Sequence, residues 1–216
     1  MYCELRAMDI PQEKRISGLY VIIDPDACAG RPAVDVARAA LEGGARMVQW
    51  RDKRRDKGDQ LVDARAITEL CRERGALFIV NDHADLALAA RADGVHLGQH
   101  DLPIEVVRPI VGDAAVIGVS TNNAAEARDA EARGASYVAV GSIFPTSTKE
   151  TTRPASTERL REVKSAVAVP VVAIGGINAT NIAEVVAAGA DAAAVISAVC
   201  GAADPRAAAA ELAAAF

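Results

Sequence analysis

The segment at residues 81–101, NDHADLALAARADGVHLGQHD, contains the pattern that decides the fold. It follows the apolar run LFIV at residues 77–80 and includes a second apolar run, GVHL, at residues 94–97. Both runs have the length and composition of short buried strands. Residues 84–91, between them, are sufficient for about two turns of helix. We therefore predict a parallel strand–helix–strand unit, the repeating element of α/β folds.

A carboxylate follows each of the two predicted strands. Asp82 comes just after the first and Asp101 just after the second, and parallel strands end at the same edge of a sheet. Because neighbouring strands lie about 5 Å apart, the two side chains are expected close enough to share a divalent cation and its phosphate ligand. A second interpretation stays open at this point: Asn81 or Asp82 caps the helix at 84–91, and Asp101 caps a helix that begins near Pro103.

The same alternation of short strand and helix continues along the chain. The strands are rich in Val and Ile and apolar nearly throughout, as parallel strands covered on both faces should be. Several helices end at a glycine that is followed by a small residue and the next strand, as in RGALFIV and AGADAAAV. Strands are predicted at residues 19–24, 46–50, 77–80, 94–97, 116–119, 137–140, 171–174 and 192–196, and helices at 32–42, 59–74, 84–91, 104–111, 124–133, 157–166, 181–188 and 205–215.

Eight strands alternating with eight helices predict an α/β fold, a single-domain (β/α)8 TIM barrel over residues 1–216. Residues 1–18 are expected to form a short leading segment, with a helix at 9–17. An open, doubly wound sheet is the alternative. It is disfavoured because no GxGxxG motif follows the first strand and the chain shows no second half.

Charge and cysteine content limit the classes of function. The formal net charge of -5 argues against nucleic acid or an anionic membrane as a partner. Neither a secretory signal nor an apolar run long enough to span a bilayer is present in the sequence. The four cysteines, Cys3, Cys28, Cys71 and Cys200, form no CxxC pair, so neither a disulfide framework nor a zinc site is expected. We expect a cytoplasmic protein that acts on small molecules. The sequence does not decide the oligomeric state, and a homo-oligomer is one of the possibilities.

In such a barrel the active site lies in the loops after the strands. After the second strand comes QWRDKRRDK, a basic cluster in which Gln49, Arg51 and Lys53 alternate and so point to one side of an extended chain. The cluster predicts an anion site, and a solvated charged loop is the competing interpretation. Ser120 follows the fifth strand. Because Asn123 already suits the cap of the next helix, Ser120 is available for another role.

Three later loops carry residues that suit phosphate. After the sixth strand comes GSIFPTSTK, in which Thr146, Thr148 and Lys149 are residue types that phosphate recognition uses, although a plain surface loop has a similar composition. After the seventh comes AIGGIN, where Gly175 and Gly176 allow close approach of a ligand to the backbone. After the eighth comes VIS, and these last two loops are where barrels most often hold a phosphate. One rim therefore combines a carboxylate pair with several anion sites, which suggests a metal-bound diphosphate, a monophosphate and a group transfer between them.

These segments together resemble thiamine-phosphate synthase along nearly the whole chain. The resemblance lies in QWRDK, NDHADLAL, DGVHLGQHDLP, IGVST, GSIFPTSTK, AIGGIN and the closing VIS, in the right order and with the right separations. It implies a (β/α)8 transferase that joins 4-amino-5-hydroxymethyl-2-methylpyrimidine diphosphate to a thiazole phosphate, carboxylated or plain. The products are thiamine monophosphate and diphosphate, and the implied cofactor is Mg²⁺.

The resemblance also implies roles for individual residues. Asp82 and Asp101 are expected to hold Mg²⁺. The groups expected to carry catalysis are Arg51, Lys53, Ser120 and Lys149. The expected substrate-binding set is Gln49, Trp50, Arg51, Asp52, Lys53, Asn81 and Ser120 on the pyrimidine side, with Lys149 on its diphosphate, and Thr146, Ser147, Thr148, Gly176, Ile196 and Ser197 toward the thiazole phosphate.

The expected chemistry is a dissociative step, in which the aminopyrimidine stabilises a carbocation while cationic groups stabilise the departing diphosphate. No covalent enzyme intermediate is expected. The sequence departs from the family pattern at Trp50, at Asp52, where Glu is usual, and at Ser156, where Gly is often found. Because of Ser156, the sequence does not decide how the loop after Lys149 is arranged or whether it closes. A thiazole tautomerase of the same fold and a non-catalytic sensor of thiamine precursors are the rival interpretations.

Overall fold

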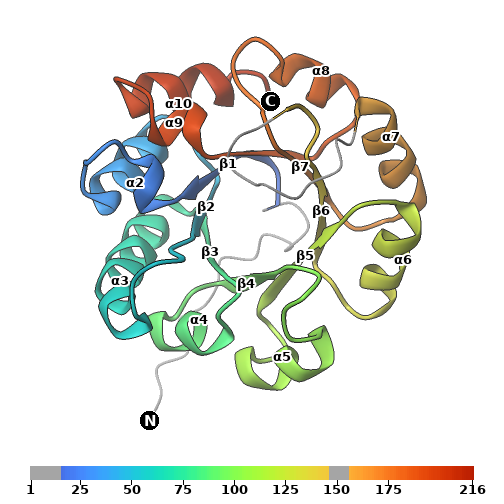
Figure 1. The fold of residues 1–216 in the computed structure, drawn as a ribbon, viewed down its shortest axis with the longest axis horizontal. Helices are drawn as coiled ribbons and strands as arrows, with labels where there is room; N and C mark the ends of the chain where they lie inside the picture. Colours follow the sequence, from blue (N-terminus) through green and yellow to red (C-terminus); the bar gives the residue numbers. More distant parts are fainter. Residues whose placement is uncertain (1–15, 146–155) are drawn as a thin grey trace.

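The computed structural model describes residues 16–145 and 156–216 and shows a closed barrel of parallel strands inside a ring of helices (Figure 1). Each strand pairs with the next, and β1 also pairs with β8 in the register Gly18 to Ala192, which closes the barrel. The predicted TIM barrel is confirmed, and the open sheet is excluded by this last pairing. The strands are β1 (Gly18–Ile23), β2 (Met47–Trp50), β3 (Leu77–Asn81), β4 (Gly94–Leu97), β5 (Val116–Thr121), β6 (Tyr137–Gly141), β7 (Val171–Ile174) and β8 (Ala192–Val195).

The helices connect successive strands and cover the outside of the barrel. Within the described residues, every predicted strand and helix after the leading segment begins and ends within two residues of its expected bounds. The helix expected at 9–17 falls mostly outside the described residues, and Ile16 and Ser17 are not helical. The helical elements are η1 (Pro25–Ala27), α2 (Ala33–Glu42), α3 (Lys57–Arg74), α4 (Ala84–Ala90), α5 (Ile104–Val111), α6 (Ala124–Ala132), α7 (Thr157–Ala166), α8 (Ile182–Ala187), α9 (Ser197–Cys200) and α10 (Pro205–Ala213).

Short side-chain caps fix where two of these helices begin. The Asn123 side chain accepts hydrogen bonds from the backbone N–H groups of Ala125 and Glu126, at 3.0 Å each. The hydroxyl of Ser156 accepts from Arg159 N at the start of α7. Ser156 therefore has a local role as a helix cap, which is worth about 1 kcal/mol in comparable helices.

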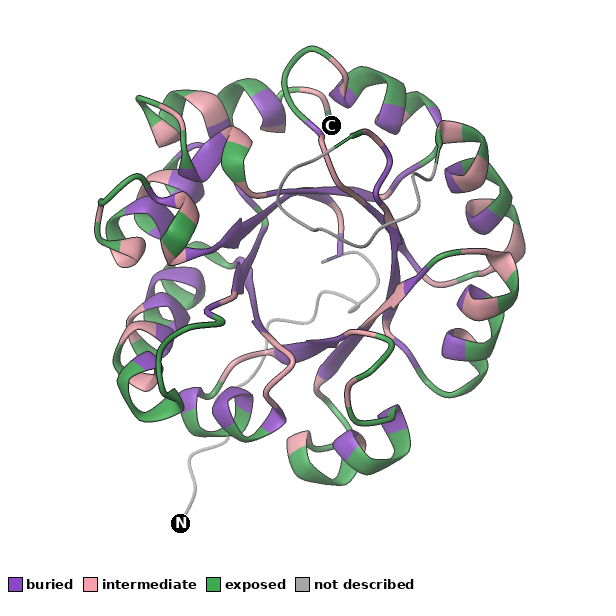
Figure 2. Cartoon of the chain, viewed as in Figure 1, coloured by how far each residue is buried: buried purple, intermediate pink, exposed green. Residues whose placement is uncertain are grey.

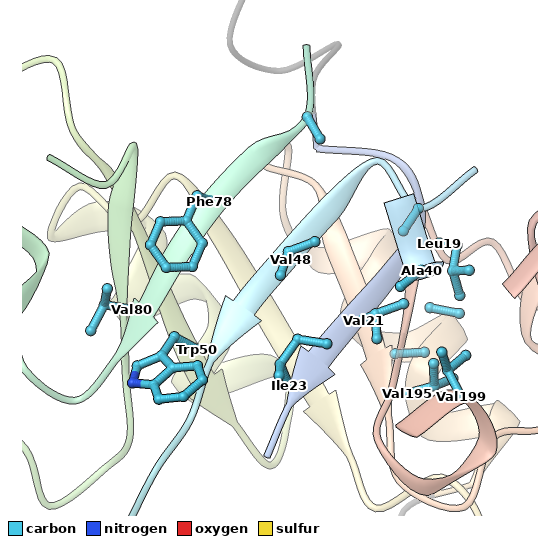
Figure 3. Close-up of a cluster of buried hydrophobic side chains, with 14 of the residues drawn as sticks. Leu19, Val21, Ile23, Ala40, Val48, Trp50, Phe78, Val80, Val195 and Val199 are labelled. Atoms are coloured by element: carbon cyan, nitrogen blue, oxygen red, sulfur yellow. The ribbon is translucent and has the colours of Figure 1, made fainter. Parts of the chain in front are cut away.

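Alternation along each strand divides the apolar side chains between two cores. The outer core lies between strands and helices and includes Leu19, Val48 and Phe78, which Figure 3 shows on neighbouring strands. Figure 2 shows the buried faces of the helices turned toward it. Full burial of one such side chain contributes about 1.5–3 kcal/mol. This layer therefore fixes the positions of the strands, and with them the positions of the loops at their ends.

The inner core fills the barrel and changes character along its axis. Ile16, Met47 and Leu77 close the end at which the strands begin, and all are at most 1% exposed. Toward the carboxyl ends of the strands, inward positions become polar, with Gln49 and His96 buried among the apolar side chains. Because the barrel interior is apolar where the strands begin and polar toward their carboxyl ends, it favours a binding site at the carboxyl ends of the strands. Among the helices of the described residues, none is long and apolar enough to cross a membrane.

Candidate active site

A cavity of about 900 Å³ opens at the carboxyl ends of the strands. It brings together residues from loops that are distant in sequence, as expected for this barrel edge. Four of the predicted site residues lie outside the described part of the chain, and the site is described without them: Thr146, Ser147, Thr148 and Lys149. Of the residues predicted from the sequence, the cavity is lined by Arg51, Lys53, Asn81, Asp82, Asp101, Ser120, Gly176, Ile196 and Ser197.

Two residues expected to bind substrate face away from this cavity. Trp50 is 1% exposed, lies in the outer core (Figure 3), and its Nε1–H donates to Gln60 Oε1 at 3.0 Å. Asp52 accepts from Arg54 N at 2.9 Å and from Arg55 Nε at 2.5 Å. Both side chains therefore have their partners outside the cavity, because alternate residues of an extended chain face opposite sides, and a substrate-binding role for Trp50 and Asp52 stays a prediction.

Gln49 points into the barrel, as the alternation predicts, but lies below the main cavity. It is 2% exposed, and its Nε2 donates to the Tyr20 hydroxyl at 2.7 Å. A small cavity of about 20 Å³ lies beside it and shares Arg51, Asn81 and several other lining residues with the larger one. Gln49 is therefore part of the polar layer beneath the site.

The capping interpretation of the two carboxylates is excluded. The N-cap of α4 is His83 and that of α5 is Pro103, and neither helix receives a side-chain cap. Asp101 instead accepts from Gly98 N at 2.7 Å, within its own loop. Asp82 and Asp101 follow the paired strands β3 and β4, and both line the cavity. The structure thus places the carboxylates together at the rim.

The environment of Asp82 disfavours its charged form. Burial and, after it, the adjacent Asp101 raise the pKa of this carboxyl to about 6, although Lys53 and Arg51 act in the opposite direction. Asp82 also has a φ of 61°, in the left-handed region that a residue with a side chain rarely adopts. Two carboxylates held together against both charge repulsion and backbone preference are typical of a functional site.

The carboxylate pair fits a hard divalent cation. Oxygen ligands are what Mg²⁺ prefers, usually one or two carboxylates completed by water and substrate phosphate. Among the described residues, no group of three or more His, Cys, Asp or Glu side chains could hold a metal ion by itself. The donor set therefore suits a cation that is bound jointly with a phosphorylated ligand.

Arg51 is oriented by a carboxylate that the sequence analysis did not identify. Its Nη1 pairs with Asp24 Oδ2 at the end of β1, and both side chains are largely buried, 13% and 11% exposed. Asp24 is the first polar residue after its strand, so the rule that found Asp82 could also have found it. The pairing orients one guanidinium edge of Arg51, a residue that lines the cavity.

His96, which lines the cavity, is the second residue that the sequence analysis did not identify. It is 8% exposed, and its ring nitrogens lie 2.9 Å from the Tyr137 hydroxyl and 2.9 Å from Ser120 Oγ. Its neighbours Val95 and Leu97 face the outer core. Strict alternation within GVHL would have placed His96 inside the barrel.

Sequence comparison decides the family. The family model described as thiamine monophosphate synthase matches residues 19–199. The chain belongs to the thiamine monophosphate synthase family. A thiamine-phosphate synthase of Moorella thermoacetica is 50% identical over 195 residues, which cover 90% of this chain and 93% of that protein. One from Methanoculleus marisnigri is 50% identical over 195 residues, or 90% and 92% of the two chains.

A solved structure of the same family has the same fold. Thiamine phosphate pyrophosphorylase from Pyrococcus furiosus is 42% identical, covers 95% of this chain and 97% of its own, and superposes with a TM-score of 0.87. The resemblance stated from the motifs is confirmed, and with it the assignment to the enzymes of thiamine biosynthesis. Membership in the thiamine monophosphate synthase family makes the chain a transferase that acts on small phosphorylated molecules.

Proposed function

We propose that the chain joins 4-amino-5-hydroxymethyl-2-methylpyrimidine diphosphate to a thiazole phosphate, with Mg²⁺, to give thiamine monophosphate and diphosphate. The observation that carries this proposal is the placement of Asp82 and Asp101 in the same cavity as Arg51 and Lys53. Asp82 and Asp101 follow β3 and β4, whereas Gly176 and Ser197 follow β7 and β8, which lie opposite those two strands in the closed barrel. Figure 1 shows β3 and β4 on the other side of the barrel from β7. Separate anion-binding regions on facing walls suit two phosphorylated substrates.

On the pyrimidine side, Asp82 and Asp101 would hold Mg²⁺, which when bound supplies positive charge to the departing diphosphate. Arg51 and Lys53, from the neighbouring strand, add two cationic groups to the same wall. Charge held in place before the reaction stabilises a developing anion without reorganisation. By the family pattern Lys149, which lies outside the described residues, would join them.

On the thiazole side, we propose that Gly176, Ile196 and Ser197 bind the monophosphate. Gly176 has a φ of 66°, and Gly175 before it has a φ of 101°, so this turn requires glycine. The absence of side chains lets the turn pack closely against Ser142 and Phe144, and both glycines line the cavity. Holding both substrates in one cavity supports a dissociative reaction, in which the thiazole nitrogen captures a pyrimidine carbocation and no residue of the protein serves as nucleophile.

The direct test is turnover of the purified chain with both substrates, with and without Mg²⁺. We expect thiamine monophosphate to form only with the metal. Added MgCl₂ together with the pyrimidine diphosphate is also expected to raise Tm, because a ligand that binds only the folded state stabilises it. Isomerisation of the thiazole phosphate without condensation would favour the tautomerase, and binding without turnover would favour the sensor.

Gly176→Ala should weaken thiazole phosphate binding. A Cβ at this position would lie 2.6 Å from Pro145 O and 2.8 Å from Phe144 Cβ, so the turn must shift. We expect affinity for the thiazole phosphate, measured by calorimetry, to fall about tenfold or more, and stability to fall by about 1–2 kcal/mol from the left-handed backbone.

The matched control is Gly134→Ala. Gly134 also has a positive φ, 92°, but a Cβ there would meet no atom within 4 Å. It should lose only about 1–2 kcal/mol, the cost of a left-handed backbone, because no neighbouring atom has to move, and keep full affinity. Equal affinities for the two variants would contradict a phosphate site at Gly176.

A further inference from the structure

Four hydrogen bonds join five polar side chains into a continuous chain within the inner core. Gln49 Nε2 lies 2.7 Å from the Tyr20 hydroxyl, which lies 3.1 Å from the Tyr137 hydroxyl. The Tyr137 hydroxyl lies 2.9 Å from His96 Nδ1, and His96 Nε2 lies 2.9 Å from Ser120 Oγ. We refer to these five residues as the relay. Only its His96 and Ser120 end lines the large cavity.

The barrel is built to accommodate this relay. Tyr20 and Tyr137 are each at most 1% exposed, and their rings meet edge to face at 6.3 Å. The His96 ring stacks on Tyr137 at 5.6 Å. Gly118 leaves the space for Tyr137, because a Cβ at Gly118 would lie 2.0 Å from the Tyr137 ring. Two hydroxyls fully buried in an apolar barrel are costly unless each is hydrogen-bonded, so their geometry is closely constrained.

The donor at one end favours one direction for every other bond in the relay. The Gln49 amide N–H donates to the Tyr20 oxygen, so the single hydroxyl hydrogen of Tyr20 can point to Tyr137. The hydroxyl of Tyr137 then donates to His96 Nδ1. Burial raises the pKa of both tyrosines, so both hydroxyls keep their hydrogens.

The same donor-to-acceptor order continues through the imidazole ring of His96 to Ser120. A neutral His96 whose Nδ1 accepts a hydrogen bond must carry its hydrogen on Nε2, and that hydrogen points to Ser120 Oγ. The hydroxyl hydrogen of Ser120 is then left to point into the cavity. The buried end of the relay thereby determines whether Ser120 offers the ligand a donor or an acceptor.

We propose that Gln49, Tyr20 and Tyr137 are positioning residues that hold His96 in the Nε2–H tautomer and present the Ser120 hydroxyl to the substrate as a hydrogen-bond donor. Gln49 acts here through Tyr20 from beneath the cavity. Only the last step, from Ser120 to the substrate, rests on the proposed function. The donor and acceptor roles along the relay do not depend on bound substrate, so they are a property of the free protein.

The first test is the tautomer of His96, from ¹⁵N NMR of the full chain labelled at histidine, at pH 8. The sequence has three histidines, and His96→Asn assigns the signal. We expect the Nε2–H tautomer in the wild type. Gln49→Glu replaces the donor by a carboxylate that only accepts, so it should reverse each bond and convert His96 to the Nδ1–H tautomer.

A double variant separates the relay from a direct effect of the new charge. Gln49→Glu with Tyr20→Phe removes the hydroxyl that connects Gln49 to Tyr137, so His96 should return to the Nε2–H tautomer. An Nδ1–H tautomer in the wild type, or a tautomer that Gln49→Glu leaves unchanged, would overturn the relay. Circular dichroism and Tm establish that each variant is folded.

The second test is a double-mutant cycle on turnover. Tyr137→Phe and Ser120→Ala should each lower kcat about tenfold, the effect of losing one buried hydrogen bond. Because both act through one hydroxyl, the double variant should be no slower than the slower single variant. Losses that multiply would show that Tyr137 does not act through Ser120 and would overturn the positioning role.

Thr68→Val provides the matched control for the cycle. Thr68 is a buried residue of α3, 5% exposed, whose hydroxyl donates to Ala64 O at 3.0 Å and to Ala90 O at 2.9 Å, away from the cavity. It should lose stability and keep kcat. If the wild type makes no thiamine monophosphate, the proposed function fails with the turnover cycle, while the tautomer experiment still decides the relay.

Discussion

Asp101→Ala is expected to lower the rate of thiamine monophosphate formation by about 100- to 1,000-fold, and Asp82→Ala by a similar factor. Losses of this size follow from removing a group that stabilises developing charge in a closed site. The two residues line one cavity, and the negative charges of their carboxylates repel each other there. Steady-state turnover over a range of Mg²⁺ concentrations should show that each variant needs more Mg²⁺ than the wild type to reach half of its maximal rate. Turnover within threefold of the wild type would exclude both from the metal site.

Two further aspartate variants separate loss of chemistry from loss of fold. Asp129→Ala changes an exposed carboxylate of α6, 67% exposed, and should leave turnover unchanged. Asp82→Asn removes the repulsion with Asp101 and places at φ 61° a residue that tolerates the left-handed region. It should lose activity like the alanine variant and yet gain about 1 kcal/mol of stability, or about 3 °C in Tm.

Arg51→Ala is expected to lower kcat/KM for the pyrimidine diphosphate by about 100-fold, because it removes a preorganised cation from the wall that faces the leaving group. It also leaves Asp24 buried without its partner, at a cost of about 1–3 kcal/mol. Arg51→Lys should recover only part of the activity, since an ammonium lacks the planar fork that pairs with carboxylate and phosphate together. Both kcat/KM and Tm are measured.

The control for Arg51 lies three residues further along the same loop. Arg54 pairs with Asp26, but its side chain is 75% exposed and outside the cavity. Arg54→Ala should therefore leave kcat/KM and Tm close to the wild type. Equal losses in Arg51→Ala and Arg54→Ala would mean that the basic loop acts through its overall charge, the solvated-loop interpretation, rather than through one oriented side chain.

The fold was predictable because its signals are local. Short apolar strands bounded by glycine repeat along the chain, and each helix is long enough to be recognised from the apolar and polar positions around it. Helix α9 was not predicted because a helix of four residues, Ser197–Cys200, has too few positions to show a period. The left-handed φ of a single residue, such as Asp82, likewise leaves no mark on composition.

The site was predictable where position alone selects a residue. Asp82 and Asp101 stand just beyond two strands, and the barrel rule places such residues at one rim. His96 lies inside a strand, among apolar residues, where a single polar side chain resembles a core position. A motif such as QWRDK groups residues that are neighbours along the chain, whereas the side chains of Trp50 and Asp52 point to the other face of the strand from those of Gln49 and Arg51.

Closure of the barrel also has a consequence for how the protein is made. β1 (Gly18–Ile23) leaves the ribosome well before its second partner, β8 (Ala192–Val195), is synthesised. At ordinary translation rates the β1 edge waits roughly ten to thirty seconds for that neighbour. An incomplete chain that stops before residue 192 has open edges at both β1 and β7, and open edges promote association with other chains. Truncated products of this gene are therefore expected to aggregate rather than to persist as partial barrels.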